Sequence, residues 1–147
     1  ADPGSVALQA GRPLLVVAHG AEQVAFETVV VAWKDTREAR HAVADALPLL
    51  KSADKVIVVT VAVKADQQIH DGIADVVAFL LGHGVNARSE VLQGSDDGSR
   101  LVEFLAAHRA DLVVSGAYGH SRLREWAFGG VTRSLLDETG LNRFMSS

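Results

Sequence analysis

Short apolar segments alternate with longer amphipathic ones along most of this 147-residue chain, and that alternation limits the fold more than any other feature. The short segments are apolar and rich in β-branched residues, which is typical of strands, whereas the longer ones repeat apolar residues at helical spacing. Successive strands joined by helices predict an α/β fold, with an open, mainly parallel sheet, right-handed crossovers and helices on both faces. The predicted strands are residues 28–33, 55–63, 85–92 and 111–115, and the predicted helices are residues 35–50, 66–81, a segment after the turn at 95–99, and 130–138.

Local signals refine three of these elements. Asp35 is a polar residue with Glu38 three positions later, which is a helix-start signature. Pro48 argues against this first helix running undisturbed to its end, because proline removes a backbone donor and clashes with the preceding turn. Residues 85–92 alternate polar and apolar side chains, which suits a strand at the edge of the sheet.

The two ends of the chain differ in strand character. Residues 13–18 form an extra strand-like run whose Leu and Val side chains are too apolar to be left in water, whereas the tail 140–147 is a poor strand. An open sheet has exposed edges, which natural proteins pair or cover. We therefore expect residues 13–17 to pair at the edge near the C-terminal strand, within the chain or across a two-fold dimer.

Composition excludes several classes of protein. The length favours a single domain, and 14 Lys and Arg against 18 Asp and Glu give a formal charge of −4, which argues against general binding to nucleic acid or to a membrane surface. The absence of cysteine excludes disulfide scaffolds, thiol catalysis and Cys-based zinc sites. The six histidines show no metal-ligand spacing, so no metal site is expected. Elimination leaves a soluble, cytoplasmic protein as the expectation.

A glycine-punctuated stretch after the strand 111–115 is the most informative motif. In GAYGHSRLREWAFGGVT, Gly116, Gly119 and Gly129 follow the spacing G-x2-G-x9-G, and Gly130 lies where the last predicted helix begins. Glycine allows close approach of the backbone, and a helix N-terminus offers N–H groups and a positive dipole end to phosphate. Thr132 adds a hydroxyl donor. The spacing alone is equally compatible with a surface loop containing ordinary turn glycines.

This stretch resembles the nucleotide-binding signature of universal stress proteins, G-x2-G-x9-G-[ST]. The resemblance covers residues 27–139 in order and includes VVVAWKDTREARHAVADALPLL at residues 29–50. It implies the family's Rossmann-like fold, a five-stranded parallel sheet that binds ATP, with Mg²⁺ as an optional companion, between the ends of its first and fourth strands. The matching positions are Ala32 and Val61 beside the adenine, Gly116 and Gly119 by the ribose, and Gly129, Gly130, Val131 and Thr132 at the phosphates.

Two departures from the family pattern affect that expectation. Lys34 stands where ATP-binding members usually carry an aspartate that contacts the adenosine, and Gly130 replaces the expected Ser or Thr. A lost hydrogen bond costs on the order of 1 kcal/mol, and up to ~3 with a charged partner, which is ~5- to 100-fold in affinity. Binding of ATP or a related adenine nucleotide by a stress-response regulatory module is the leading hypothesis. The alternative is a nucleotide-free dimerisation module of the same fold.

An enzymatic function is the third hypothesis, as a relative of ATP pyrophosphatases or electron-transfer flavoproteins. The sequence shows no P-loop-like glycine cluster after the first strand and no general base near the glycine stretch, so any ATP hydrolysis is expected to be slow. Besides the nucleotide, the expected partner is a second copy of the chain, which would form a homodimer through sheet-edge strands.

The resemblance also suggests a domain boundary. Residues 1–26 are similar to the last strand region of a preceding universal stress domain, and residues 27–147 form the domain described above. The other possibility is that residues 1–26 are an arm belonging to this same domain. Trp33, at the end of the first strand, is a candidate for stacking on a base or for covering the start of the helix.

Overall fold

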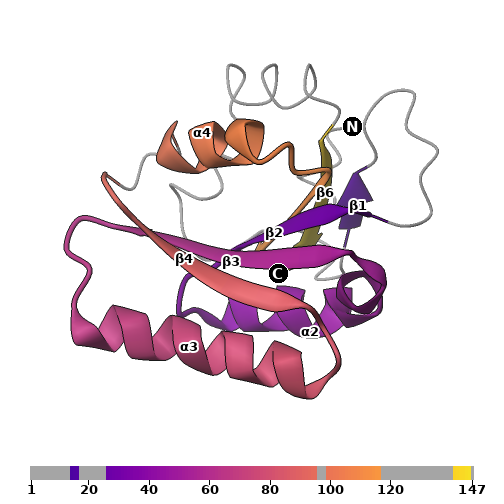
Figure 1. Ribbon diagram of the computed structural model, residues 1–147, viewed down its shortest axis with the longest axis horizontal. Coiled ribbons are helices and arrows are strands. Elements are labelled where there is room, and N and C mark those ends of the chain that lie inside the picture. The colour runs from indigo at the N-terminus through magenta and orange to yellow at the C-terminus, as the bar shows by residue number, and fades with distance from the viewer. Residues whose placement is uncertain (1–13, 17–25, 96–98, 117–140, 147) are drawn as a thin grey trace.

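The computed structural model describes residues 14–16, 26–95, 99–116 and 141–146, and every structural statement below concerns these residues (Figure 1). The strands are β1 (Leu14–Val16), β2 (Thr28–Ala32), β3 (Lys55–Ala62), β4 (Ala87–Gln93), β5 (Leu112–Gly116) and β6 (Asn142–Ser146). The helices are α2 (Arg37–Ser52), α3 (Gln67–Gly82) and α4 (Ser99–Ala107). The predicted alternation of strands and helices is therefore confirmed from β2 to β5.

The strands form one sheet in the order β1-β6-β5-β2-β3-β4. The five strands from β2 to β6 are all parallel, and β1 is added antiparallel to β6. The predicted open, mainly parallel sheet with an extra N-terminal strand is thus confirmed, and β4 lies at the predicted edge. The direction of strand addition reverses at β2, because β3 lies on one side of β2 and β5 on the other.

The helices cover the sheet from both sides (Figure 1): α2 and α3 lie beneath it and α4 above it. Alternate strand residues point to opposite faces, so one apolar run fills two cores. Val29, Val31, Val56 and Val58 pack with α2 and α3, whereas Val30, Ile57 and Val59 pack with α4. All of these valines and Ile57 are at most 1% exposed.

Hydrogen bonds that side chains accept from backbone N–H groups fix where α2 and α3 begin. The Thr36 hydroxyl accepts a hydrogen bond from the Ala39 backbone N–H (3.2 Å), and the Asp66 carboxylate accepts one from Ile69 N–H (2.9 Å). The N-cap of α2 is therefore Thr36, one residue after the expected Asp35. Such caps satisfy backbone donors that the first helical turn leaves unpaired.

The expectation that Pro48 would disturb α2 is wrong, because the helix continues through it to Ser52. Pro48 itself is exposed, whereas Ala46 and Leu50 on either side are fully buried in the core beneath the sheet. Burial of the last turn compensates for the backbone hydrogen bond that proline cannot make.

The expectation of a poor strand in the tail is also wrong, because Asn142–Ser146 forms β6 between β5 and β1. Phe144 packs with the core of α2 and α3, and Met145 with the core of α4. Burial on both faces and pairing on both edges override the low strand propensity of this sequence. The predicted pairing of the N-terminal strand is confirmed within the chain, with Leu15 of β1 opposite Phe144.

Asp111 links the amino ends of β2, β5 and β6. Its carboxylate accepts hydrogen bonds from the backbone N–H groups of Glu27 (2.8 Å) and Thr28 (3.0 Å), and its backbone carbonyl accepts one from the Asn142 side chain (2.8 Å). These contacts fix the register of β2, β5 and β6, whose carboxyl ends then reach the same edge of the sheet.

Candidate functional site

The carboxyl ends of β2, β3 and β5 meet where the strand order reverses. In open α/β sheets this is the edge at which ligands bind, because the connections on either side of the reversal diverge and leave a crevice. Val31 is paired with Val58 on one side and with Val114 on the other. Beyond this level β2 continues for one residue and β5 for two, whereas β3 extends four residues further to Ala62. The predicted nucleotide site falls at this reversal.

The structure brings the two residues predicted to border the adenine onto one face. Ala32 is paired with Val59, and Val61 follows two residues later on β3, so both side chains lie on the face that α4 covers. Ala32 is 5% exposed and Val61 is half-buried. Leu92 of β4 is paired directly with Val61 and is half-buried in the same core. These three side chains form an apolar row along the carboxyl edge.

Leu92 was not among the predicted site residues. Alternation along residues 85–92 indicates that Leu92 is an inward residue, but only the β3–β4 register shows that it continues the row from Val61. Val102 of α4 is half-buried and packs against the same core.

Gly116 ends β5 against the first turn of α2. A Cβ atom built on Gly116 would lie 2.8 Å from the Cβ of Glu38, 2.9 Å from its carbonyl carbon and 3.0 Å from the Ala39 nitrogen. Two of these three neighbours are backbone atoms, so they cannot turn aside as a flexible side chain can. Gly116 therefore allows the end of β5 and the start of α2 to touch, and this contact holds the two sides of the strand-order reversal together.

The turn between β2 and α2 passes from one face of the sheet to the other. Trp33 is half-buried and packs with the core of α2 and α3, on the face opposite Ala32 and Val61. Its backbone N–H donates to the Val59 carbonyl (2.8 Å) and so extends the pairing of β2 with β3. Of the two alternatives for Trp33, covering the helix layer fits this placement, and stacking on a base beside Ala32 does not.

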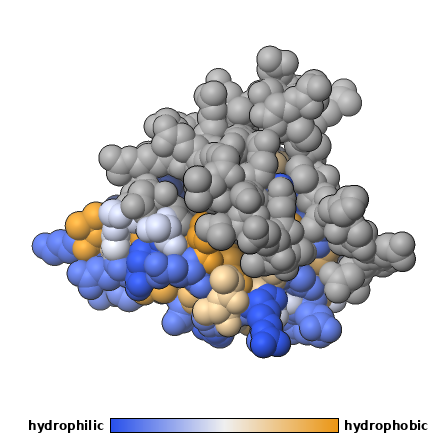
Figure 2. All heavy atoms as spheres, turned by 90° about the horizontal axis from the view of Figure 1, so that it is seen from above, coloured by the Kyte–Doolittle hydropathy of each residue, from blue (hydrophilic) through white to orange (hydrophobic). Residues whose placement is uncertain are grey.

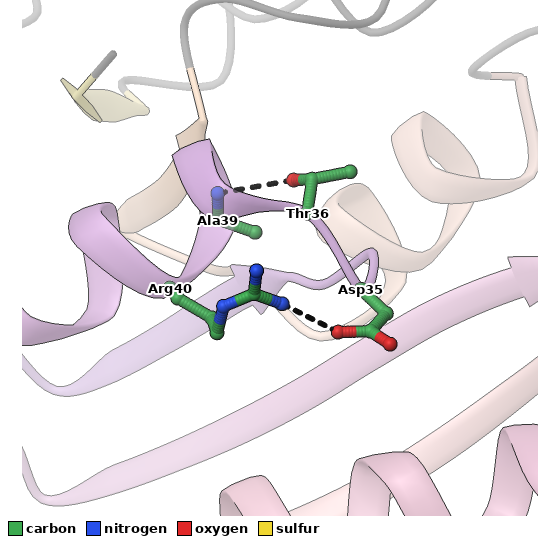
Figure 3. A network of polar contacts seen from close by, with 4 residues as sticks. All are labelled: Asp35, Thr36, Ala39 and Arg40. Atoms are coloured by element: carbon green, nitrogen blue, oxygen red, sulfur yellow. Dashed lines mark hydrogen bonds and ion pairs between the residues drawn. The ribbon is translucent and has the colours of Figure 1, made fainter.

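Polar contacts shape the rest of this turn (Figure 3). The Thr36 hydroxyl faces Ala39 at the helix start, while the Asp35 carboxylate points the other way and pairs with the Arg40 guanidinium at 2.6 Å. Lys34 lies half-buried between Trp33 and Asp35, and its carbonyl accepts a hydrogen bond from Thr36 N–H (2.8 Å). Lys34 is thus at the carboxyl end of β2, as the sequence predicts.

Comparison with solved structures identifies this arrangement of strands. The universal stress protein UspA from Lactobacillus plantarum superposes with a TM-score of 0.65 at 16% identity, covering 85% of this chain and 100% of that chain. The chain has the universal stress protein fold. A universal stress protein from Archaeoglobus fulgidus DSM 4304 gives a TM-score of 0.67 at 14% identity, but the match covers 92% of this chain and only 49% of that one. No protein-family model and no curated protein matches the chain.

A third solved structure contains a ligand. It is a universal stress protein in complex with cAMP, which matches with a TM-score of 0.62 at 21% identity over 84% of this chain and 98% of that one.

The five parallel strands of the universal stress protein fold correspond here to β2–β6, and β1 is an addition at the β6 edge.

Five predicted site residues lie outside the residues that the structure describes. They are Gly119, Gly129, Gly130, Val131 and Thr132, together with the predicted helix 130–138 that would present phosphate-binding N–H groups. Their part of the universal stress protein signature stays a prediction. Within the described ranges, no three His, Asp or Glu side chains are grouped to hold a metal ion.

No helix in the described part of the chain is long and apolar enough to cross a membrane. The face seen in Figure 2 mixes hydrophilic and hydrophobic patches over the coloured residues.

Proposed function

We propose that this chain is a universal stress domain that binds ATP or a related adenine nucleotide and acts as a regulatory module. The observation that carries the proposal is the meeting of Ala32 and Val61 on one face at the strand-order reversal, beside the end of β5. A flat apolar base can pack against such a row of side chains, and noncovalent contacts at the strand ends are sufficient to bind it. The solved universal stress protein with cAMP supports an adenine nucleotide as the ligand class.

In this proposal each part of the site has its own task. Ala32 and Val61 border the adenine, and Gly116 with Gly119 lies by the ribose. Backbone N–H groups at Gly129, Gly130 and Val131, with the Thr132 hydroxyl, hold the phosphates, because an N-terminal helix turn offers unpaired donors and a positive dipole end. Mg²⁺ would accompany the phosphates of ATP. No catalytic residue is assigned, so ligand binding rather than turnover is the proposed activity.

Replacing Gly119 by valine tests the glycine cradle. The branched side chain blocks close approach of the backbone to the ligand, so we expect the affinity for ATP to fall at least tenfold, which is about 1.4 kcal/mol. Isothermal titration calorimetry measures the change, and far-ultraviolet circular dichroism checks that both proteins are folded. Equal affinities of the variant and the wild type would show that the cradle is misassigned.

Replacing Lys34 by aspartate tests the departure at the end of β2. The lysine places a positive charge where the family's aspartate contacts the adenosine, so we expect Lys34→Asp to raise the affinity for adenosine nucleotides about 5-fold or more. Lys34→Met separates loss of the positive charge from gain of the carboxylate. An affinity that is the same in all three proteins would mean that position 34 does not face the ligand.

The alternative function is a nucleotide-free dimerisation module, favoured by the replacements at Lys34 and Gly130. We propose a homodimer through sheet-edge strands in either case, because β1 and β4 are the outer strands of the described sheet and isologous pairs are the commonest assembly. Calorimetric titration with ATP distinguishes the two, and light scattering establishes the dimer: the leading proposal predicts a dimer that binds ATP, and the alternative predicts a dimer that does not.

We also propose that residues 1–26 are the end of a preceding universal stress domain. The solved chain from Archaeoglobus fulgidus DSM 4304, of which this match covers 49%, supports a tandem arrangement. The coding sequence upstream of Ala1 tests the proposal. A second glycine signature followed by a short helix is expected there, and its absence would leave residues 1–26 as an arm of this domain.

A further inference from the structure

A groove runs between α2 and α3, on the face of the sheet opposite the proposed nucleotide site. It has two sections of about 470 and 290 Å³. Trp33, Asp35 and Gly72 line both sections, so the sections adjoin at these residues. From Asp66 at one end to Phe79 at the other, the groove follows α3 for roughly 20 Å at 1.5 Å per residue. Volumes of ~300–1,000 Å³ are typical of small-molecule sites.

The sequence explains why the two helices leave this space. Gly72, Asp75, Val76 and Phe79 recur at spacings of three and four residues, so they form one stripe along α3. The facing stripe of α2 carries Ala44. Glycine and alanine are the two smallest residues, and a Cβ atom built on Gly72 would meet nothing within 4 Å. The neighbouring side chains therefore do not close the gap.

The surface of the groove is apolar with an acidic rim. Val43 and Val76 are buried at its base, while Trp33 is half-buried and Phe79 is 44% exposed. Exposed aromatic surface of this kind beside a cavity is characteristic of ligand sites.

Three carboxylates and one guanidinium surround this apolar surface. Asp35 is paired with Arg40 at 2.6 Å, and Asp66 accepts the hydrogen bond that caps α3. Asp75, in the middle of the α3 stripe, forms no ion pair with another described residue. A negative charge beside an apolar wall attracts a cation more strongly than it would in open water.

We propose that this groove binds a small organic cation, a primary amine on an extended alkyl or aryl body. The apolar body would lie along Trp33, Val76 and Phe79, with the ammonium group at the Asp75 carboxylate. Trp33 lines the same section of the groove as Asp75, and aromatic surface there would stabilise the cation further. This ligand is opposite in charge to a nucleotide, so the acidic rim favours the amine and repels phosphates. The inference does not depend on nucleotide binding, because none of the residues that line the groove is among the proposed nucleotide-binding residues.

Three ligands that share one alkyl chain test the chemical class. Octylammonium, 1-octanol and octanoate carry a positive, a neutral and a negative head, and calorimetry with the full chain measures each affinity. We expect octylammonium to bind ~3- to 10-fold more tightly than 1-octanol, as an exposed charge pair allows, and octanoate to bind most weakly. Equal affinity of octylammonium and 1-octanol, or tighter binding of octanoate, would overturn the assignment of a cation site.

Two glycine variants locate the site. Gly72→Leu places a side chain where both sections adjoin, so we expect it to abolish octylammonium binding. Gly82→Leu is the matched control, because its Cβ also meets open space on the same helix but does not line the groove. If Gly72→Leu binds octylammonium as the wild type does, the groove is not the site.

A charge variant tests the residue that carries the proposal. Asp75→Asn keeps the shape of the side chain, and we expect it to remove most of the preference for octylammonium over 1-octanol while leaving 1-octanol binding unchanged. An unaltered preference would exclude Asp75 as the counter-charge. This variant keeps the test decisive if Gly72→Leu does not fold, and thermal unfolding followed by circular dichroism shows whether each variant is folded.

Discussion

Gly116→Ala is expected to lower the free energy of unfolding by about 1–3 kcal/mol, the range typical of overpacking at a tight contact. The added methyl group would lie 2.8 Å from the Glu38 Cβ and 2.9 Å from the Glu38 carbonyl carbon, closer than Cβ atoms approach other atoms in folded proteins. The first turn of α2 would have to shift, and the Thr36 cap on the Ala39 N–H holds that turn in place. Total stabilities are only ~5–15 kcal/mol, so the loss is a large share.

Chemical denaturation with urea measures this change, and Gly82→Ala is its control. A Cβ atom on Gly82 meets nothing within 4 Å, so the same substitution there should leave stability unchanged or raise it slightly. If Gly116→Ala and Gly82→Ala have equal free energies of unfolding, the contact between β5 and α2 is looser than the structure shows.

Deletion of residues 1–18 is expected to change the oligomeric state or the solubility of the protein. β1 covers one edge of β6, with Leu14 opposite Met145 and Val16 opposite Arg143. Without β1, the backbone donors and acceptors along that edge of β6 lose their partners, and an open strand edge recruits another chain. We expect a shift in mass by light scattering, or precipitation at concentrations at which the full chain stays in solution.

A shorter deletion, of residues 1–11, is the control because it keeps β1. It should behave as the full chain does. Should the deletion of residues 1–18 also have the same mass and solubility as the full chain, the pairing of β1 with β6 contributes nothing to assembly, and the segment is a dispensable arm.

The sequence predicts most of the sheet because its central strands are buried on both faces. The apolar run at 55–63 has to be a strand covered by helices on both sides, and α3 and α4 provide that cover around β3. The sequence does not predict β6, because Asn142–Ser146 becomes a strand through pairing with its neighbours, β5 and β1, rather than through its own composition. The effect of Pro48 is likewise decided by its surroundings, since burial of Leu50 keeps the last turn of α2 helical.

The candidate site is only partly readable from the sequence. The resemblance points to Ala32 and Val61, and strand register is needed to show that they share a face and that Leu92 continues their row. The contact of Gly116 with α2 depends on how closely a distant helix packs, which no local pattern encodes. The groove beside Trp33 likewise depends on two distant helices, which place the small residues Ala44 and Gly72 along the same cavity.

Equilibrium dialysis against an equimolar mixture of ATP, GTP, CTP and UTP tests the central claim most directly. After equilibration, the protein is denatured and the nucleotides on its side of the membrane are identified by mass spectrometry. The proposed site predicts enrichment of ATP over the other three in the wild type and loss of that enrichment in Gly119→Val. Equal amounts of all four nucleotides on both sides of the membrane would contradict nucleotide binding and favour the dimerisation module.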